Sequence, residues 1–99
     1  MRLTPAQIHA ITQTVSRLTD GTAEVFLFGS RLDDRTRGGD VDLFIETPSP
    51  LTLVERARIK MELEDLVRLP IDIVAQVRNS TPTPCQSIAR AGAIRLEAP

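Results

Sequence analysis

The sequence predicts a small α/β (α+β) protein in which a mixed sheet of about four strands is flanked by helices, in the order αββαβαβ. Two observations support this. Short runs rich in Val, Ile, Leu and Phe are typical of buried strands. They alternate with longer segments in which apolar residues recur every three or four positions, as in helices packed on one side. The 99 residues fit one domain with a modest core, so we expect residues 1–99 to form a single unit.

The first helix is predicted near the N-terminus. Thr4 suits the N-cap, and Gln7 stands three residues later, where it can close a capping box. Pro5 fits the first helical position, and Asp20-Gly21 ends the helix. The apolar residues at helical spacing are Ile8, Ile11, Val15 and Leu18.

Two strands and a second helix are expected next. EVFLF (residues 24–28) reads as a buried strand, and DVDLFIE (residues 40–46) reads as a strand with alternating polarity. Residues 49–69 then regain helical character, with Ser49 as the cap and Pro70 barring continuation. The apolar contacts of this helix are expected from Val54, Ala57, Ile59, Met61, Leu63, Leu66 and Val67.

The last part of the chain predicts one strand, a short helix and a final strand. IDIVA (residues 71–75) is apolar enough for a central strand, and QVRNSTPTP after it has the composition of a loop. Thr83 and Pro84 begin a short helix that Gly92 can end, and AIRL (residues 93–96) is the last possible strand.

Composition excludes several classes of function. A net charge of -1 argues against a general polyanion binder, and three Phe without Trp or Tyr argue against an aromatic platform for nucleic acid, so we expect no direct nucleic-acid binding. The single cysteine, Cys85, cannot form an intramolecular disulfide, and the N-terminus lacks a basic segment followed by a long apolar run. We therefore expect a cytoplasmic protein that does not contact membranes.

The loop in VFLFGSRLDDRTRGGDVDLFIE carries the first candidate site residues. Asp40 and Asp42 share one face of a strand, about 7 Å apart at about 3.3 Å per residue. Two carboxylates held in this way repel each other unless a cation lies between them. Oxygen ligands without nearby His or Cys favour Mg²⁺ or Mn²⁺ over zinc.

Gly29-Ser30 supplies a candidate phosphate site. A glycine directly after a buried strand lets the backbone turn sharply, and the serine adds a hydroxyl and a backbone N–H at an expected helix start. Arg31 can add a charge-assisted contact, or it is simply solvated. A tight turn alone would explain Gly29-Ser30, and a solvated strand edge alone would explain Asp40 and Asp42. Neither explains why the two features occur together. A Walker P-loop is excluded, because the sequence contains no G-x-x-x-x-G-K-[ST].

GSRLDDRTRGGDVD resembles the signature of the nucleotidyltransferase superfamily related to DNA polymerase beta, in which Gly-Ser precedes Asp-x-Asp by about ten residues. Nine residues separate Ser30 from Asp40, at the short end of that spacing. The length, the preceding helix, LPIDIVA and SIARAGAIRL resemble the minimal nucleotidyltransferase (MNT) group over roughly residues 5–96. The resemblance implies two divalent ions, Mg²⁺ or Mn²⁺, and transfer of a nucleoside monophosphate from a nucleoside triphosphate, with ATP expected.

The resemblance also implies a third carboxylate on a later strand. Glu46 shares the face of Asp42 but lies about 13 Å further along, too far for ions about 3.5–4 Å apart. Asp72 is the better candidate, because it can point to the Asp40 and Asp42 face while its neighbours pack. The predicted catalytic and metal-binding residues are thus Asp40, Asp42 and Asp72, and the predicted nucleotide-binding residues are Gly29, Ser30 and Arg31.

Three functions fit this set of residues. The MNT resemblance implies an antitoxin that transfers AMP to a helical HEPN-domain ribonuclease toxin. The second is a small-molecule transferase resembling aminoglycoside-modifying enzymes, which would need a substrate-binding domain or a homo-oligomer. The third is a non-catalytic module of the same fold that neutralises a partner, which the presence of all three carboxylates disfavours.

Overall fold

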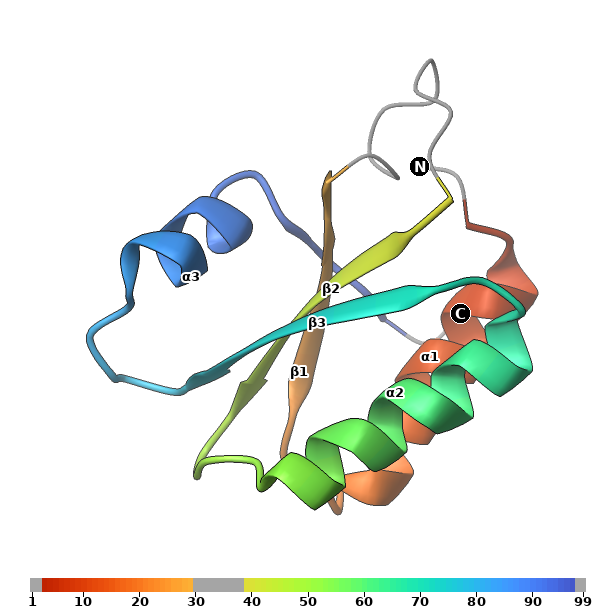
Figure 1. Cartoon of the computed structure of the whole chain (residues 1–99), viewed down its shortest axis with the longest axis horizontal. Helices are drawn as coiled ribbons and strands as arrows, with labels where there is room; N and C mark the ends of the chain where they lie inside the picture. The colour runs from red at the N-terminus through yellow and green to blue at the C-terminus, as the bar shows by residue number, and fades with distance from the viewer. Residues whose placement is uncertain (1–2, 30–38, 98–99) are drawn as a thin grey trace.

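The computed structural model describes residues 3–29 and 39–97. Its elements follow the predicted order αββαβαβ along the chain (Figure 1). They are α1 (Pro5–Leu18), β1 (Glu24–Phe28), β2 (Val41–Thr47), α2 (Leu53–Val67), β3 (Ile71–Val77), α3 (Pro84–Arg90) and β4 (Ile94–Arg95).

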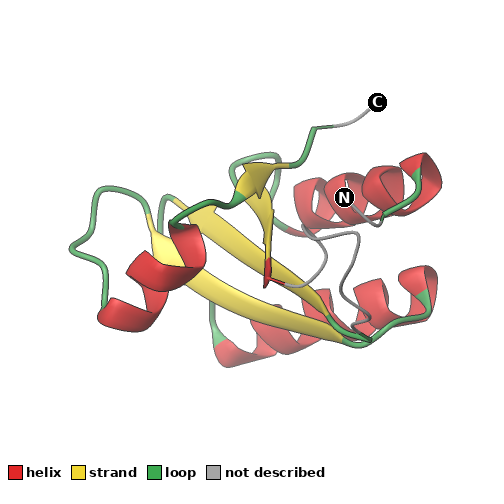
Figure 2. Ribbon diagram, turned by 90° about the horizontal axis from the view of Figure 1, so that it is seen from above, coloured by secondary structure: helices red, strands yellow, loops and turns green. Residues whose placement is uncertain are grey.

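The strands form one mixed sheet in the order β3-β2-β1-β4. β1 is antiparallel to both β2 and β4, whereas β2 and β3 are parallel and are connected through α2. Helices α1 and α2 lie on one side of the sheet and α3 lies on the other (Figure 2). The predicted fold class, a small mixed sheet flanked by helices, is confirmed.

The main core lies between the sheet and helices α1 and α2. Alternate residues of the strands point into it, as the period of two in a strand requires. The opposite face of the sheet has a smaller apolar cluster of Phe26, Phe44 and Ala89 of α3. The two rings pack edge to face, with their centroids 5.9 Å apart. Fully buried side chains of the main core include Ile11, Leu27, Val41, Leu43, Ile45, Ile59, Leu63 and Ile71.

Each described helix begins with a capping box, in which a threonine hydroxyl and a side chain three residues later satisfy each other's backbone N–H. The capping box at Thr4 of α1 was predicted and is confirmed. The predicted start of α3 at Thr83 and Pro84 is also confirmed. The three capping pairs are Thr4 with Gln7, Thr52 with Glu55, and Thr83 with Gln86.

No helix in the described ranges is long and apolar enough to cross a membrane.

The predicted boundary of α2 was wrong by three residues at its start. Residues 49–69 were expected to form this helix with Ser49 as the cap, but Thr52 is the cap and the helix begins at Leu53. The physical reason is Glu55, whose carboxylate accepts the backbone N–H of Thr52 at 2.9 Å. Of the expected apolar contacts only Ile59, Leu63 and Val67 are buried.

The expectation that IDIVA forms a central strand was also wrong. β3 is an edge strand of the described sheet, and only β2 pairs with it. An exposed edge of this kind invites pairing with other chains unless side chains cover it. Long polar side chains of α2 cover this edge, and they donate hydrogen bonds to the carbonyls of the residues on both sides of Asp72.

Candidate active site

Asp42 and Asp72 lie side by side on neighbouring strands. They are direct partners in the parallel register of β2 and β3, and such strands run about 4.8 Å apart. Their neighbours in sequence are buried in the main core, so both carboxylates lie on the other face of the sheet, which also carries α3. Asp40 lies directly before β2 and is exposed. The structure therefore brings the three predicted carboxylates to one end of one face.

The negative charges at this end interact with one another. Burial raises the pKa of the Asp42 carboxyl above its ordinary value, and the charges of Asp72 and then Asp40 raise it further. Each effect disfavours the ionised form of Asp42. A cation bound here would oppose these effects, because it would stabilise the ionised form.

Gly29 packs its backbone against the carboxylate of Asp42. Its φ of +78° belongs to the left-handed region, which residues with a side chain rarely adopt. A Cβ atom at this position would lie 2.2 Å from Oδ2 of Asp42, well inside van der Waals contact. Glycine is thus required here both for its backbone conformation and for the space that the aspartate occupies.

Two of the predicted nucleotide-binding residues, Ser30 and Arg31, lie outside the described residues, as does the helix start expected there. Their roles remain predictions. Gly29, the last described residue before them, follows β1 and lies against the carboxylate of Asp42.

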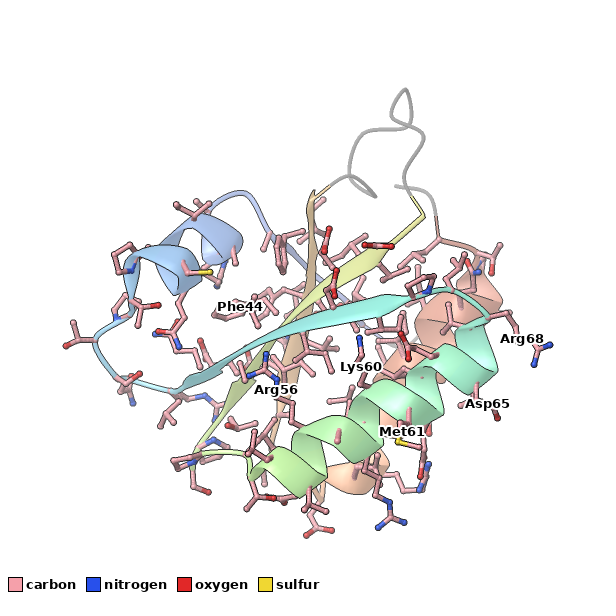
Figure 3. The ribbon with its side chains drawn as sticks, in the orientation of Figure 1. Phe44, Arg56, Lys60, Met61, Asp65 and Arg68 are labelled. Atoms are coloured by element: carbon pink, nitrogen blue, oxygen red, sulfur yellow. The ribbon has the colours of Figure 1, made fainter. Side chains whose placement is uncertain are left out.

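The backbone on both sides of Asp72 is held by cations of α2. Lys60 donates a hydrogen bond to the carbonyl of Ile71, and Arg56 donates one to the carbonyl of Ile73. Figure 3 shows both side chains pointing from α2 toward β3. These contacts satisfy carbonyl groups that an edge strand would otherwise expose. They fix the two residues between which the Asp72 side chain projects.

A carboxylate of the same helix completes this attachment. Glu64 accepts the backbone N–H of Ile71 at 2.9 Å, and it also lies 3.5 Å from Lys60. The bond from the Ile71 amide holds the pKa of Glu64 below its ordinary value, and the charge of Lys60 acts in the same direction. Sequence reasoning missed this group of residues. Its available signal was the spacing of Arg56, Lys60 and Glu64, four residues apart, which places them on one side of a helix.

Glu46, the carboxylate rejected on distance, is engaged elsewhere. Arg78 Nε lies 3.2 Å from its Oε1, and the same guanidinium lies 4.0 Å from Glu24 and donates to the carbonyl of Thr22. The far end of this face thus has its negative charges balanced by an arginine. The end with Asp42 and Asp72 has no such pairing among the described residues.

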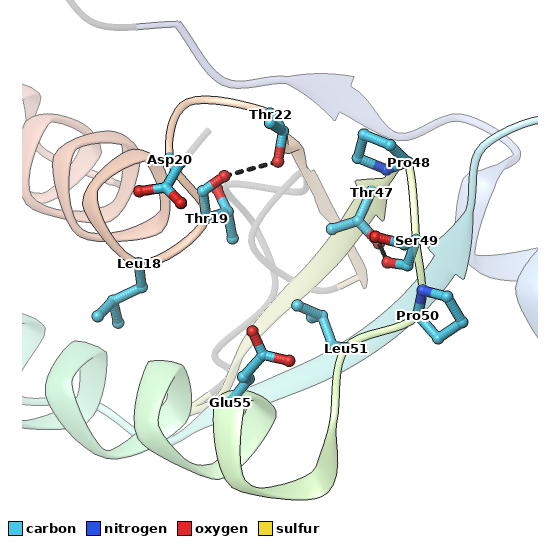
Figure 4. Close-up of a pocket in the computed structure, with 10 residues that line it drawn as sticks. All are labelled: Leu18, Thr19, Asp20, Thr22, Thr47, Pro48, Ser49, Pro50, Leu51 and Glu55. Carbon is cyan, nitrogen blue, oxygen red and sulfur yellow. Dashed lines mark hydrogen bonds between the residues drawn. The ribbon is translucent and has the colours of Figure 1, made fainter.

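Two hollows lie nearer the other end of β2 and do not include the three aspartates. One, of about 500 Å³, lies on the face of Asp42 and Asp72 and is open to solvent. Its lining residues are Glu46, Gln76, Pro82, Ser87, Arg90, Ala91 and Gly92. The other, of about 300 Å³, lies between the end of α1 and the connection from β2 to α2, and none of the predicted site residues lines it (Figure 4).

The carboxylates suit a metal ion that other ligands complete. In the described ranges, no group of three or more Asp, Glu, His or Cys side chains is arranged to hold a metal ion. Mg²⁺ does not require one, because it commonly takes one or two carboxylates and fills its shell with water and substrate phosphates. The paired oxygen donors of Asp42 and Asp72, with Asp40 adjacent, fit that pattern.

A mixed sheet with helices on both faces, paired aspartates on adjacent strands and a glycine packed against one of them defines a candidate phosphoryl-transfer domain. A family model described as a nucleotidyltransferase domain matches residues 8–96, and the chain belongs to this family. The resemblance to the superfamily related to DNA polymerase beta is thereby confirmed, and the class of activity is nucleotidyl transfer. A search of curated proteins returned no significant match.

Proposed function

We propose that this chain is a divalent-metal-dependent nucleotidyltransferase that transfers AMP from ATP to a hydroxyl of a partner protein, the HEPN-domain toxin of a toxin–antitoxin pair. The observation that most supports catalysis is the register of β2 and β3, which places Asp42 beside Asp72 on the face that Gly29 adjoins. The family match supplies the class of reaction.

Asp40, Asp42 and Asp72 would hold Mg²⁺ or Mn²⁺, two ions by the resemblance. The metal would supply charge neutralisation at the triphosphate and a lower pKa for the attacking hydroxyl. In our proposal, Gly29 leaves space for the carboxylate of Asp42 next to the phosphates, and Ser30 and Arg31 hydrogen-bond the phosphate oxygens.

The reaction forms one bond and breaks one. The acceptor oxygen bonds to the α-phosphorus of ATP, and the bond to the leaving pyrophosphate breaks. The hydroxyl proton passes to Asp72, which is exposed and so can release it to water. Asp42 is the less exposed member of the pair, which suits it to positioning rather than proton release.

A protein acceptor is favoured because neither of the two hollows described above includes the aspartates. The hollow on the catalytic face is open to solvent, and α3 leaves the end with the aspartates uncovered. The rest of an acceptor site must then come from another chain. The MNT resemblance suggests that the partner chain is helical.

The test is transfer of label from α-labelled ATP after co-expression with the protein of the adjacent reading frame. A small helical protein carrying Arg-x-x-x-x-x-His is expected there from the resemblance. We expect label on that protein with Mg²⁺, and none with EDTA or with Asp42→Asn. The Asp42→Asn chain should still bind the partner, since the substitution is nearly isosteric.

Each other result selects a different function. A wild-type chain that silences the partner without labelling it would show an inert antitoxin. Label on a small hydroxylated compound, with none on protein, would show a small-molecule transferase. Glu46→Gln is the matched control, because Glu46 lies on the same strand and face but is bound by Arg78.

A further inference from the structure

The outer side of α2 carries apolar residues that the core does not use. Leu53 is 85% exposed, Val54 78% and Met61 69%, and Ala57 between them is also exposed. We call these four residues the outer stripe. The residues of α2 that pack into the core lie on the other side of the helix and are Ile59, Leu63 and Val67. Contiguous exposed apolar surface of this kind marks a contact with another molecule.

Two opposite charges flank the outer stripe, and the midpoint between them lies between Met61 and Glu62. Arg58 lies about one turn before Met61 and Asp65 about one turn after it, seven residues and roughly 10.5 Å apart. Seven residues make close to two turns, so both side chains lie on one face. Asp65 points away from β3 in Figure 3 and forms no ion pair with any described residue. Arg58 is 66% exposed and lies 3.4 Å from Glu62.

This pattern is complementary to itself when it is read in the opposite direction. If a second α2 lies antiparallel to the first with a two-fold axis between Met61 and Glu62, Arg58 of each copy faces Asp65 of the other. Met61 then lies next to Met61 across the axis, and Val54 lies opposite Leu69, just past the C-terminal end of the other helix. A parallel arrangement would instead place like charges opposite each other. We propose that the outer stripe of α2 is the interface of a two-fold symmetric homodimer of this chain.

The proposed dimer leaves the candidate active site open. α2 packs on one side of the sheet, and Asp42 and Asp72 lie on the other, so the two sites of a dimer face outward. The inference does not depend on the nature of the acceptor. Helix α2 has 15 residues and is about 22 Å long, so a single helix pair buries less than the roughly 800 Å² per partner of a standard interface. The dimer should therefore be weak and concentration-dependent.

Sedimentation equilibrium over about 5 to about 500 µM tests this directly, a range that brackets micromolar dissociation constants. The mass should rise from 10.9 kDa toward twice that value. Asp65→Arg should raise the dissociation constant at least about 10-fold, because Arg58 would then face an arginine. Arg58→Asp combined with Asp65→Arg should restore dimerisation, since the charges are exchanged but remain opposite.

Ile88→Lys is the control, because Ile88 is 76% exposed on α3, on the other side of the sheet. It should leave the dissociation constant unchanged. A wild-type chain that stays monomeric throughout would overturn the proposal. A dimer that Asp65→Arg leaves intact, or that the exchanged pair fails to restore, would overturn the assignment to this surface. Circular dichroism of each variant confirms folding, which these exposed positions should not affect.

Discussion

The two faces of the sheet use alternate residues of the same strands for different purposes. On the side of α1 and α2, Leu43 and Ile71 are fully buried in the main core. On the side of α3, the residues next to them in sequence are Asp42 and Asp72. Because side chains alternate along a strand, one register serves both faces. Stability and the candidate chemistry should therefore be separable by substitutions one residue apart.

The face with the aspartates is open because α3 is short. Its 7 residues cover Phe26 and Phe44 at the middle of the sheet, where Ala89 is buried. At the end of the sheet near Gly29, Asp72 is exposed and Asp42 is half-buried. Apolar packing thus holds the middle of this face, and the polar end remains accessible to a ligand.

The largest expected difference is between Leu43 and its neighbour Asp42. Leu43→Ala should lower the free energy of unfolding by about 2–5 kcal/mol, because it leaves a cavity among fully buried side chains. Asp42→Asn should not lower it. Urea unfolding of both variants measures the contrast. Equal losses would mean that the polar face contributes to stability as the core does.

Gly29→Ala should have the next largest effect. The left-handed backbone conformation costs on the order of 1–3 kcal/mol for a residue with a side chain, and the new Cβ displaces the Asp42 carboxylate. Gly92→Ala is the matched control, since its φ of +76° is similar but nothing lies within 4 Å of the added Cβ. Gly29→Ala should therefore lose nucleotidyl transfer while Gly92→Ala retains it. Equal activities would show that the contact with Asp42 is not required.

Loss of the bonds from α2 to β3 should have a smaller effect. Lys60→Ala removes the donor to the Ile71 carbonyl, which lies next to Asp72, at a cost of about 1 kcal/mol. Lys60→Met keeps most of the aliphatic chain, and a similar loss in both variants would assign the effect to the hydrogen bond. Thermal unfolding gives the stability, and amide exchange at Val74, whose backbone N–H points toward β2, reports on the strand. Unchanged exchange in Lys60→Ala would contradict the role of α2 in covering this edge.

The smallest effect is the pH dependence that Asp42 contributes. Its raised pKa means that the folded chain binds this proton more tightly than the unfolded chain. Protonation therefore stabilises the fold, and this stability is lost as pH rises from about 3.9, the ordinary pKa of aspartate, through the raised value. Without divalent ions, Asp42→Asn should be more stable than wild type at pH 7, and the gap should close toward pH 3. A difference in stability that widens on acidification would mean that folding lowers the pKa of Asp42 rather than raising it.

Local sequence signals predicted most of the fold. Thr4 and Gln7 fixed the start of α1, and alternation in DVDLFIE fixed which residues face the core. The start of α2 was also encoded, because Thr52 is followed three residues later by Glu55, whereas Ser49 is followed three residues later by Thr52. Periodicity could not show which apolar residues of α2 are buried, since they occur on both sides of the helix.

Tertiary contacts account for what could not be predicted. IDIVA has the composition of a central strand, and its edge position is tolerated only because Arg56 and Lys60 reach it from α2. Alternation along each strand predicted that Asp72 can share the face of Asp42, but their direct pairing depends on the parallel register of β2 and β3. The contact of Gly29 with Asp42 needed the pairing of Phe28 with Asp42, which no local pattern specifies.

The central claim is that Asp42 and Asp72 form a metal-dependent nucleotide site on the open face. Calorimetric titration with ATP, in Mg²⁺ and in EDTA, tests it without knowledge of the acceptor. We expect the wild-type chain and Glu46→Gln to bind ATP at least about 10-fold more tightly with Mg²⁺, because uncompensated carboxylates repel the phosphates. Asp42→Asn and Asp72→Asn should lose that enhancement. Equal affinity of the wild-type chain in Mg²⁺ and EDTA, or full enhancement in both aspartate variants, would contradict the account.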